Sequence, residues 1–352
     1  MIENKERKNY YDSLDFVKGI AIILVIIGHC IQCGSGKEYY ESQLFFDNGL
    51  FKFIYSFHMP LFMMISGFLF GRTNDSSLFA TLKNKTVRLL LPVFFWQTIM
   101  MVLSLLRGKP FQLNGYFISL IDGFWFLWSV WWATIICKVI SCVFKTGRIR
   151  MVAHLILILL SFITPDGHNF SLHKYMYICF LLGLIAAKRN FEVKKLNNKT
   201  SEIMLLLIMS AVYLGLFVLF NDEAYIYISG WTVLGKDSIF RVLFWDVYRV
   251  AVGSLGSAII IYISYIVIPS GYGKIVKDLG KSSCGIYIMQ TYFIVLMMKG
   301  LPNVRPNNWI NILEGIIICV SCYTIEKVLV KIPFLSEIMF GQKFKVSERD
   351  YE

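Results

Sequence analysis

Long apolar blocks alternate with short polar intervals along the whole chain. The blocks run for roughly 15 to 25 residues, which is the length at which a helix crosses a bilayer. We therefore predict an all-α, polytopic helical membrane protein with about ten transmembrane helices. The fifth and sixth spans are short and are expected to tilt or to merge. The predicted spans are centred near residues 17–33, 49–70, 87–106, 122–144, 151–163, 175–187, 203–220, 240–267, 283–298 and 309–330.

The pattern predicts one membrane domain over residues 1–352. Its longest polar intervals have about 15 to 20 residues, too few to fold alone. Residues 1–13 are expected to form an N-terminal cytosolic segment, and residues 331–352 a basic C-terminal tail. The first apolar stretch lacks a small-residue cleavage site, so we expect it to remain as a span.

Composition agrees with a membrane protein, and the charge distribution orients it. Of the 352 residues, 56% are hydrophobic and only 16% are charged, whereas soluble domains have about 25% charged residues. The net charge is +12. If the N-terminus is cytosolic, the inner loops and tails hold 22 basic residues and the outer loops hold 8. This asymmetry predicts cytosolic N- and C-termini. It also accounts for the excess of basic residues, so no nucleic-acid partner is needed to explain the positive net charge.

Two pairs among the eight cysteines have C-x-x-C spacing, Cys30 with Cys33 and Cys319 with Cys322. No cluster of histidine or cysteine accompanies them in a polar loop, as a zinc or redox site would require. We predict that they are small helix-packing residues and that the protein has no metal site.

Polar residues form one stripe on the first span. Lys18 and His29 are eleven residues apart, so they return to nearly the same helix face, roughly 16 Å apart along the axis. Asp15 lies on that face too, one turn before Lys18. Charge inside a membrane span is costly and usually functional, so we take these three residues as candidates for chemistry.

The second span has its own histidine, His58, two residues before Pro60. Proline removes a helical hydrogen bond, and we expect a kink there. His58 and His29 can then face one cavity, together with Ser56 and Ser66. Imidazole titrates near neutrality and suits proton transfer from a hydroxyl. The alternative is that each histidine only hydrogen-bonds a neighbouring helix.

Three further polar clusters have a functional and a structural interpretation. Lys85 and Arg88 lie one turn apart at the cytosolic start of the third span and could clamp phosphates, or they could simply anchor the helix. The tryptophans that begin with Trp125 could stack on a sugar, but an interfacial aromatic belt is favoured. For Asp246 and Arg249, one turn apart in the eighth span, a structural pair is the default.

Nearly the whole chain resembles the integral-membrane acyltransferase 3 family, which includes bacterial polysaccharide O-acetyltransferases and fucose 4-O-acetylase-like proteins. The most specific element is a basic residue followed ten residues later by histidine. The resemblance rests on Lys18…His29, on Phe57-His58-Met59-Pro60-Leu61-Phe62 to Ser66-Gly67-Phe68, on Lys85-x-x-Arg88-Leu-Leu-Leu-Pro92, on Trp125-Phe126-Leu127 and on Ser283-x-x-x-Tyr287.

The chain departs from the family pattern at three positions. The family often has arginine where Lys18 and Lys85 stand, and lysine lacks the bidentate fork. It commonly has histidine where Gln290 stands. Glutamine can form hydrogen bonds but cannot shuttle a proton at neutral pH. Proton transfer would therefore fall to His29.

The resemblance implies transfer of an acyl group, most often acetyl, from a cytosolic thioester such as acetyl-CoA to a glycan or lipid-linked saccharide. Acyl-CoA would be a co-substrate, with no bound cofactor, in a multi-pass protein of the bacterial inner membrane. Lys18, Lys85 and Arg88 would hold the phosphates of the donor. The roles expected of the other residues are general base for His29, ordering of the entrance for Asp15, oxyanion stabilisation for His58, Ser56 and Ser66, and acceptor contacts for Trp125, Tyr287 and Gln290.

Two other functions use the same residues. A transporter or flippase for a lipid-linked glycan would line its path with intramembrane charges and carry out no acyl chemistry. A protein of this fold that binds a ligand without turning it over is the third reading, and Gln290 gives it weight. The acceptor, and whether a covalent acyl-enzyme forms, cannot be read from the sequence.

Overall fold

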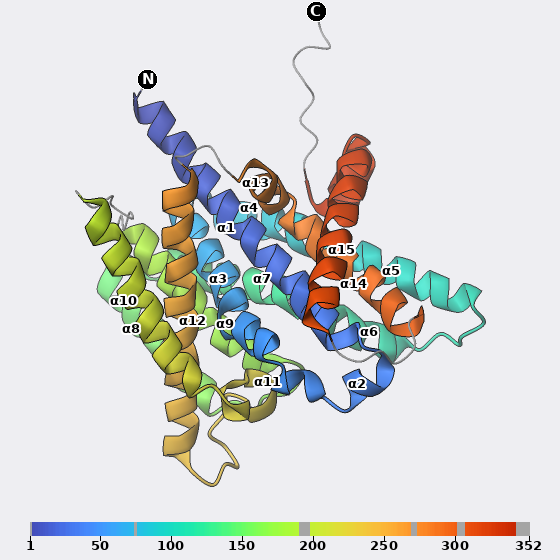
Figure 1. The fold of residues 1–352 in the computed structure, drawn as a ribbon, viewed down its shortest axis with the longest axis horizontal. Helices are drawn as coiled ribbons and strands as arrows, with labels where there is room; N and C mark the ends of the chain where they lie inside the picture. Colours follow the sequence, from blue (N-terminus) through green and yellow to red (C-terminus); the bar gives the residue numbers. More distant parts are fainter. Residues whose placement is uncertain (1, 74–75, 190–197, 269–272, 301–306, 343–352) are drawn as a thin grey trace, which may run out of the picture.

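The computed structural model describes residues 2–73, 76–189, 198–268, 273–300 and 307–342, and within these ranges it contains helices and no strand. Figure 1 shows the arrangement. In chain order the helices are α1 (Ile2–Cys33), α2 (Lys37–Glu41), η1 (Leu44–Asp47), α3 (Gly49–Thr73), α4 (Leu78–Lys85), η2 (Thr86–Leu90), α5 (Leu91–Leu106), α6 (Leu113–Asp122), α7 (Trp125–Val143), α8 (Gly147–Phe162), α9 (Phe170–Lys188), α10 (Lys199–Val218), η3 (Asp222–Ala224), α11 (Ile226–Ser229), α12 (Ile239–Val267), α13 (Lys274–Lys281), α14 (Ser283–Gly300), α15 (Asn308–Leu329) and α16 (Pro333–Phe340).

Each of the ten predicted spans falls on a helix, which confirms the prediction of a polytopic helical membrane protein. Seven helical segments in the described ranges are long and apolar enough to cross a membrane. They are Tyr11–Cys33, Gly49–Arg72, Leu78–Leu106, Trp125–Val143, Phe170–Lys188, Lys199–Val218 and Ile239–Tyr265. The fifth and sixth spans do not merge, because α8 and α9 are separate helices of 16 and 19 residues.

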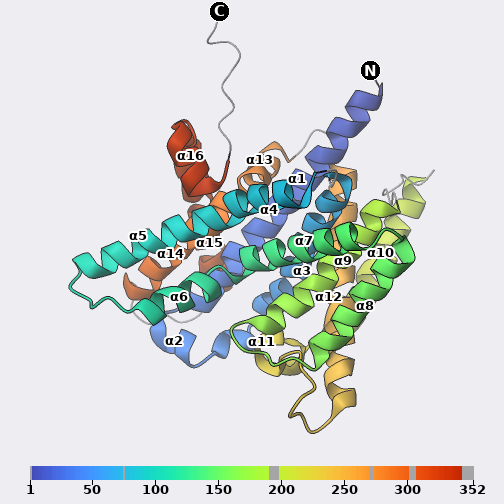
Figure 2. The ribbon, with the colours of Figure 1, turned by 180° about the vertical axis from the view of Figure 1, so that it is seen from behind.

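The third span is one rod made of three pieces. Figure 2 shows α4 and α5 running on in one direction, and a π-helical turn over Thr86–Leu90 joins them. Single π turns inside α-helices are rare and are frequent at functional sites. This turn begins directly after Lys85 and contains Arg88.

Glycines set the closest helix contacts in the bundle. On α3, Gly67 lies against the backbone carbonyl of Phe180 in α9, and in return Gly183 of α9 lies against the carbonyl of Met64. Neither site has room for a Cβ atom. Small residues let membrane helices approach to backbone contact, so this pair fixes α3, and with it His58, relative to α9.

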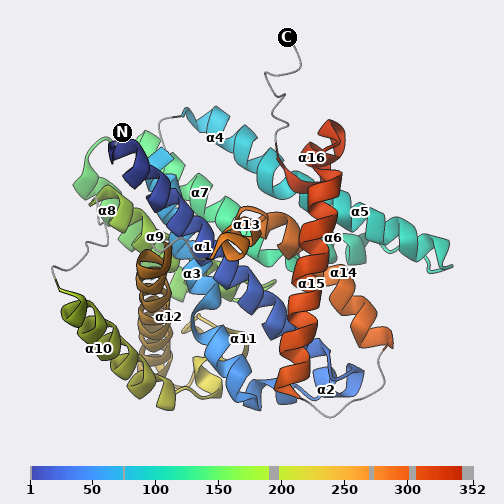
Figure 3. The same cartoon turned by 45° about the horizontal axis from the view of Figure 1, so that its top comes forward.

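A second close contact fixes the start of α1. Gly19 lies against the backbone carbonyl of Val276 in the short helix α13, and Gly280 of α13 lies against the carbonyl of Asp15. Figure 3 shows α13 beside the middle of α1. The contact places the last turn of α13 beside the Asp15–Lys18 turn.

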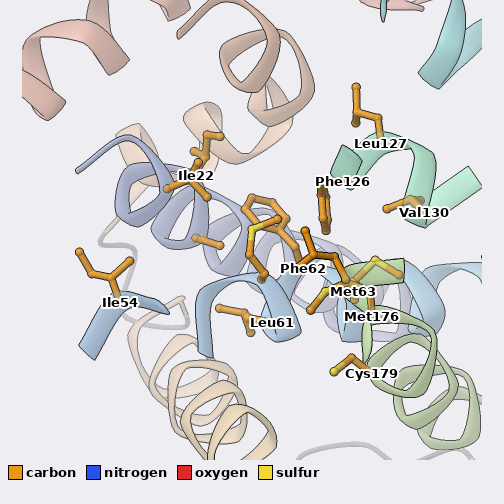
Figure 4. Close-up of a cluster of buried hydrophobic side chains, with 14 of the residues drawn as sticks. Ile22, Ile54, Leu61, Phe62, Met63, Phe126, Leu127, Val130, Met176 and Cys179 are labelled. Carbon is orange, nitrogen blue, oxygen red and sulfur yellow. The ribbon is translucent and has the colours of Figure 1, made fainter. Parts of the chain in front are cut away.

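The apolar core lies between α1, α3, α7 and α9. Figure 4 shows Ile22 of α1, Leu61 and Met63 of α3, Phe126 of α7 and Met176 of α9 turned towards one another, and all five are buried. Burial of each such side chain contributes roughly 1.5 to 3 kcal/mol in water; within a bilayer, close packing contributes more than exclusion of water. The core holds the histidine-bearing segments of α1 and α3 together.

The helices outside the spans mark the two ends of the molecule. In Figure 1 the start of α1, α13 and α16 lie at one end, and α2 and α11 lie at the other. The predicted N-terminal segment is not separate, because α1 runs from Ile2 into the first span. The predicted C-terminal tail begins with α16, which is docked by a hydrogen bond from Trp96 Nε1 to the Met339 carbonyl (3.0 Å). Residues 343–352 of that tail lie outside the described residues.

Candidate active site

A cavity of about 270 Å³ lies between α1, α3, α7, α11 and α14. Tyr40 of α2 and Tyr227 of α11 also line it, and both are exposed, at 41% and 45%. Because α2 and α11 lie at the end of the molecule away from the start of α1 (Figure 1), the cavity opens towards that end. On the predicted topology this is the outer side.

Both histidines singled out in the sequence line this cavity. His58 is 2% exposed, and its Nδ1 lies 2.7 Å from the Ile54 carbonyl oxygen. A carbonyl oxygen only accepts, so the Nδ1–H of His58 donates this bond. In the neutral ring, Nε2 is then an unprotonated acceptor. The Nδ1 of His29 lies 3.4 Å from the Gln32 Oε1, which in the same way makes Nε2 its free nitrogen.

Tyr55 lies between the two histidines and was not anticipated. Its ring lies 4.6 Å from the His58 ring, centroid to centroid, and stacks on Phe51 at 3.8 Å. Its edge reaches Gly28, where a Cβ atom would lie only 2.9 Å from Tyr55 Cε2. The glycine next to His29 therefore makes room for this ring.

The opposite wall is one face of α14. Tyr287, Gln290 and Thr291 line the cavity, and their spacing of three and four residues places them on one side of a helix. Gln290 is 2% exposed. Its Nε2 lies 3.5 Å from Thr291 Oγ1, and its Oε1 has no hydrogen-bond partner among the described residues.

The tryptophans of α7 do not act as a uniform belt. Trp125 lines the cavity, which agrees with the less favoured interpretation. Trp128 donates to the Leu120 carbonyl (3.0 Å), and Trp131 donates to Thr86 Oγ1 (3.0 Å) in the π turn. Of the four, only Trp132 is largely exposed, at 47%. Two of the four indole N–H groups thus donate hydrogen bonds inside the protein.

Tyr227 lies at the cavity mouth, and hydrogen bonds to Asp166 hold the loop that follows it in place. Asp166 Oδ2 accepts from the backbone N–H groups of Trp231 (2.7 Å) and Thr232 (2.8 Å). Its Oδ1 accepts from Lys174 Nζ at 2.8 Å. Burial alone would raise the pKa of Asp166, but these hydrogen bonds outweigh it and hold the pKa below the ordinary 3.8. The ionised carboxylate is therefore the form that fixes the loop.

The pair in the eighth span fastens the same loop. Arg249 lies 3.0 Å from Asp246, and both are almost fully buried. The guanidinium also donates to the carbonyl oxygens of Gly230 (2.7 Å) and Glu223 (3.0 Å). The structure thus places this pair in a packing role outside the cavity, as the default interpretation had it.

Ser56 and Ser66 do not line the cavity, contrary to expectation. Ser56 Oγ hydrogen-bonds the Phe53 carbonyl (2.7 Å) and the Tyr213 hydroxyl (2.6 Å). Ser66 Oγ donates to the Phe62 carbonyl at 2.8 Å. Ser56 is two residues before His58, so it lies on nearly the opposite side of α3, and the Ser66 hydroxyl is engaged by its own helix. They are not available to an oxyanion in the cavity.

The predicted phosphate-binding cations gather at the other end of α1. Lys18 Nζ pairs with Asp15 at 2.7 Å. Asp15 precedes His29 by fourteen residues, about 21 Å along the helix axis. Lys85 and Arg88 form no ion pair with any residue in the described ranges. Lys18 and Arg88 are both close enough to Cys284 to interact electrostatically with its thiol.

These cations do not line the cavity, but α14 connects the two regions. Cys284 lies one turn before Tyr287 and two turns before Thr291 on the same face. On α1, the eleven residues from Lys18 to His29 likewise lead from the cationic cluster to the cavity. The cationic cluster is thus separated from the histidines by about 10 to 16 Å along two neighbouring helices.

The described part of the chain contains no group of three or more histidine, cysteine, aspartate or glutamate side chains that could hold a metal ion. Cys30, Cys33, Cys319 and Cys322 are free thiols buried in the core. Cys33 also lines the cavity.

Comparison with known proteins gives a family match and two curated relatives. The family model described as "Acyltransferase domain" matches residues 11–328. "Nodulation protein NolL" of Sinorhizobium fredii is 28% identical over 285 residues, which is 79% of this chain and 76% of that relative. "Nodulation protein NolL" of Mesorhizobium japonicum is 33% identical over 184 residues, which is 50% of this chain and 48% of that relative. No solved structure matches the chain.

Proposed function

Since the chain belongs to the acyltransferase family that this domain model describes, we propose that this membrane-bound acyltransferase moves an acetyl group from acetyl-CoA to a hydroxyl of a cell-surface glycan or its lipid-linked precursor. Both curated relatives come from bacteria, and the bacterial inner membrane is the proposed location. The observation that carries the proposal is the pair of histidines, each with a free Nε2, in one aromatic-lined cavity.

The cavity suits a sugar hydroxyl. Five aromatic rings line it, from Tyr40, Tyr55, Trp125, Tyr227 and Tyr287. Rings present an apolar face to the C–H groups of a pyranose, while their hydroxyls and the amides beside them form hydrogen bonds. The polar groups are few and fixed, as in sites that bind small ligands.

His29 acts as the general base in the proposed reaction. Its Nε2 takes the proton of the acceptor hydroxyl while the oxygen attacks the thioester carbon. The tetrahedral intermediate then collapses, the carbon–sulfur bond breaks, and the thiolate of CoA leaves. The proton on His29 returns to that thiolate, so the step balances as thioester plus alcohol giving ester plus thiol.

The oxyanion needs donors other than those expected from the sequence. The Nε2 of neutral His58 can only accept a hydrogen bond from a group in the cavity, because the one N–H of the ring donates to the Ile54 carbonyl. The hydroxyls of Ser56 and Ser66 donate to backbone carbonyls of α3. Among the hydroxyl donors that line the cavity are those of Tyr55 and Tyr287, which lie close enough to interact electrostatically. We assign them the oxyanion role, and His58 becomes a second acceptor that orients the hydroxyl.

The donor is proposed to approach from the cationic end. Arg88 is exposed, and Lys85 is half-buried one turn away; guanidinium and ammonium groups are strong phosphate partners. The thioester arm of the donor would then follow the interval from Cys284 to Tyr287 to reach the histidines. The acceptor would enter from the side of Tyr40 and Tyr227.

The experiment is acetyl transfer from radiolabelled acetyl-CoA to glycan in membranes. With His29→Ala we expect a loss of at least a hundredfold in kcat, the usual contribution of a general base. His58→Ala should cost less, because a second acceptor orients without taking the proton. Wild-type turnover by a folded His29→Ala protein would remove His29 from the mechanism.

Transport of a lipid-linked glycan remains the second candidate, because the cavity opens towards one side and its lining would suit a saccharide. Thermal stabilisation of the purified protein by CoA or acetyl-CoA, lost in Arg88→Ala, supports the transferase. Movement of a glycan across vesicles without any such stabilisation would favour transport.

A further inference from the structure

We propose that residues 336–342, called here the docked C-terminal segment, position the donor site by fixing the backbone of Arg88. The affinity for the phosphates of acyl-CoA then depends on this segment as well as on the cations themselves. This inference rests on the proposed function, in which Arg88 belongs to the donor site. It adds Gly341 to that site as a positioning residue, because Gly341 is packed directly against Arg88.

Gly341 and Arg88 are in backbone contact. A Cβ atom on Gly341 would overlap the Arg88 carbonyl oxygen and would lie 2.6 Å from the Arg88 Cα. Gly341 also has a φ of +62°, a left-handed conformation that glycine adopts readily and that often ends a helix. The atoms that the Cβ would meet belong to the backbone, so they cannot swing aside as the end of a flexible side chain can. A side chain at this position must therefore displace the π turn or the docked C-terminal segment.

Hydrogen bonds tie the docked C-terminal segment to two of the neighbouring helices. Trp96 Nε1 of α5 donates to the Met339 carbonyl at 3.0 Å, and Gln342 Nε2 donates to Glu326 Oε1 of α15 at 2.6 Å. Ser336 Oγ closes the segment on itself by donating to the Gln342 carbonyl at 3.0 Å. Glu326 is only 2% exposed, and a buried carboxylate needs such a partner. The segment is therefore a fixed part of the folded domain.

The docked C-terminal segment also borders the start of α14, where the proposed path of the thioester arm begins. Gly285 lies against Glu326 and Phe340, and a Cβ atom on it would lie 2.5 Å from Glu326 Oε2 and 3.0 Å from Phe340 Cδ1. The residue before it, Cys284, is close enough to Arg88 to interact electrostatically. The segment thus contacts both the π turn and the beginning of α14, and it sets the spacing between them.

The Arg88 side chain depends on its backbone for its position. It is exposed, and none of the ion pairs among the described residues includes it. Bonds between a guanidinium and a phosphate are strong only in a defined geometry. With no ion-pair partner to orient the guanidinium, the position of the Cα decides which donor phosphates it can reach. A change at Gly341, which contacts that Cα, should therefore alter CoA binding first.

The test is a double-mutant cycle on the purified full-length protein with CoA as the ligand. Isothermal titration gives the Kd for CoA in wild type, Gly341→Ala, Arg88→Ala and the double variant, and assays in membranes give the KM for acetyl-CoA and for the acceptor. Gly108→Ala is the matched control. Gly108 also has a positive φ, of +76°, but a Cβ atom on it meets nothing within 4 Å, so the substitution adds the same backbone strain without the contact.

We expect Gly341→Ala to raise the Kd for CoA about fivefold, the equivalent of about 1 kcal/mol, because the guanidinium is displaced but not removed. The KM for acetyl-CoA should rise in parallel, while the KM for the acceptor stays within about twofold of wild type. In the Arg88→Ala background, Gly341→Ala should change the Kd less than about twofold, since no guanidinium is left to displace. If Gly341→Ala does not fold, Gln342→Ala, which removes the hydrogen bond to Glu326, replaces it in the cycle with the same expectation.

The outcomes separate this inference from the proposed function. An equal loss of CoA affinity with and without the Arg88 side chain would make the docked C-terminal segment a purely structural element, and so would an equal loss in Gly108→Ala. An unchanged Kd in the folded Gly341→Ala or Gln342→Ala protein would also overturn the inference. In each case the proposed acyl transfer stands, because it is judged by transfer of acetyl to glycan and by His29→Ala. If the wild-type protein binds no CoA, the proposed donor and this inference are both overturned.

Discussion

Gly28 offers the sharpest test of the site, because it adjoins His29 and contacts the Tyr55 ring, yet it has no side chain to take part in the proposed chemistry. We predict that Gly28→Ala impairs turnover by moving Tyr55. The added Cβ would lie 2.9 Å from Tyr55 Cε2, whereas ordinary contacts begin at 3.4 Å. The ring must therefore retreat by about 0.5 Å, and Phe51, already stacked on it at 3.8 Å, limits where it can go.

The magnitude follows from this displacement. A shift of about 1 Å in a positioning group costs about a hundredfold in rate, so half of that distance should cost about tenfold in kcat. Overpacking adds a loss of about 1 to 3 kcal/mol in the free energy of unfolding. Binding of CoA should not change, because Lys18 and the donor end of α1 lie about 16 Å away.

The assay measures kcat with labelled acetyl-CoA and, separately, the Kd for CoA. Gly215→Ala is the matched control, since it also adds a methyl group to a helical glycine but meets nothing within 4 Å. Unchanged kcat in Gly28→Ala, or an equal loss in Gly215→Ala, would refute the role given to the Gly28–Tyr55 contact. A loss confined to CoA binding would refute it as well.

Three more predictions follow from contacts already described. Arg88→Ala should raise the Kd for CoA about tenfold while the KM for the acceptor stays constant, because a charge-assisted phosphate contact is lost; isothermal titration measures it, and an unchanged Kd would remove Arg88 from the donor site. Ser56→Ala should leave kcat within twofold and lower stability by about 1 kcal/mol, the value of a hydrogen bond; a catalytic defect would return Ser56 to the mechanism. Asp166 has a lowered pKa, so the stability it adds is present above about pH 4 and is lost as the pH falls through its lower folded-state value. The Tm difference between wild type and Asp166→Asn should therefore narrow below pH 4, and a difference that does not vary with pH would contradict the clamp.

Much of the fold could be predicted from the sequence, because the bilayer forces apolar helices of a set length. The two histidines, Trp125, Tyr287 and Gln290 could be placed in a cavity because polar or aromatic groups inside a span need a partner. Tyr55 was within reach as well. Once His58 faces the cavity, helix geometry brings the residue three positions earlier to the same face and turns Ser56 away.

Other features depend on contacts between distant segments and left no local signal. Tyr227 lies on a four-residue helix whose position depends on Asp166, on Lys174 and on Arg249. The separation of Asp15 from the histidines follows from the length of α1, yet its partner could not be assigned until the Lys18 contact was seen. The π turn after Lys85 is a backbone feature that the residue pattern, read as an ordinary helix, does not reveal.

That π turn sets the angular phase of everything that follows it in the third span. A π turn closes its hydrogen bonds one residue further along than an α turn does. If Thr86–Leu90 became regular α-helix with no residue removed, α5 would therefore rotate by about 100° against α4. Trp96 would swing off Met339, and Gln97 would leave the Ser119 carbonyl that it now reaches at 3.0 Å. The π geometry of this stretch, rather than its length alone, therefore keeps the polar contacts of α5 in place.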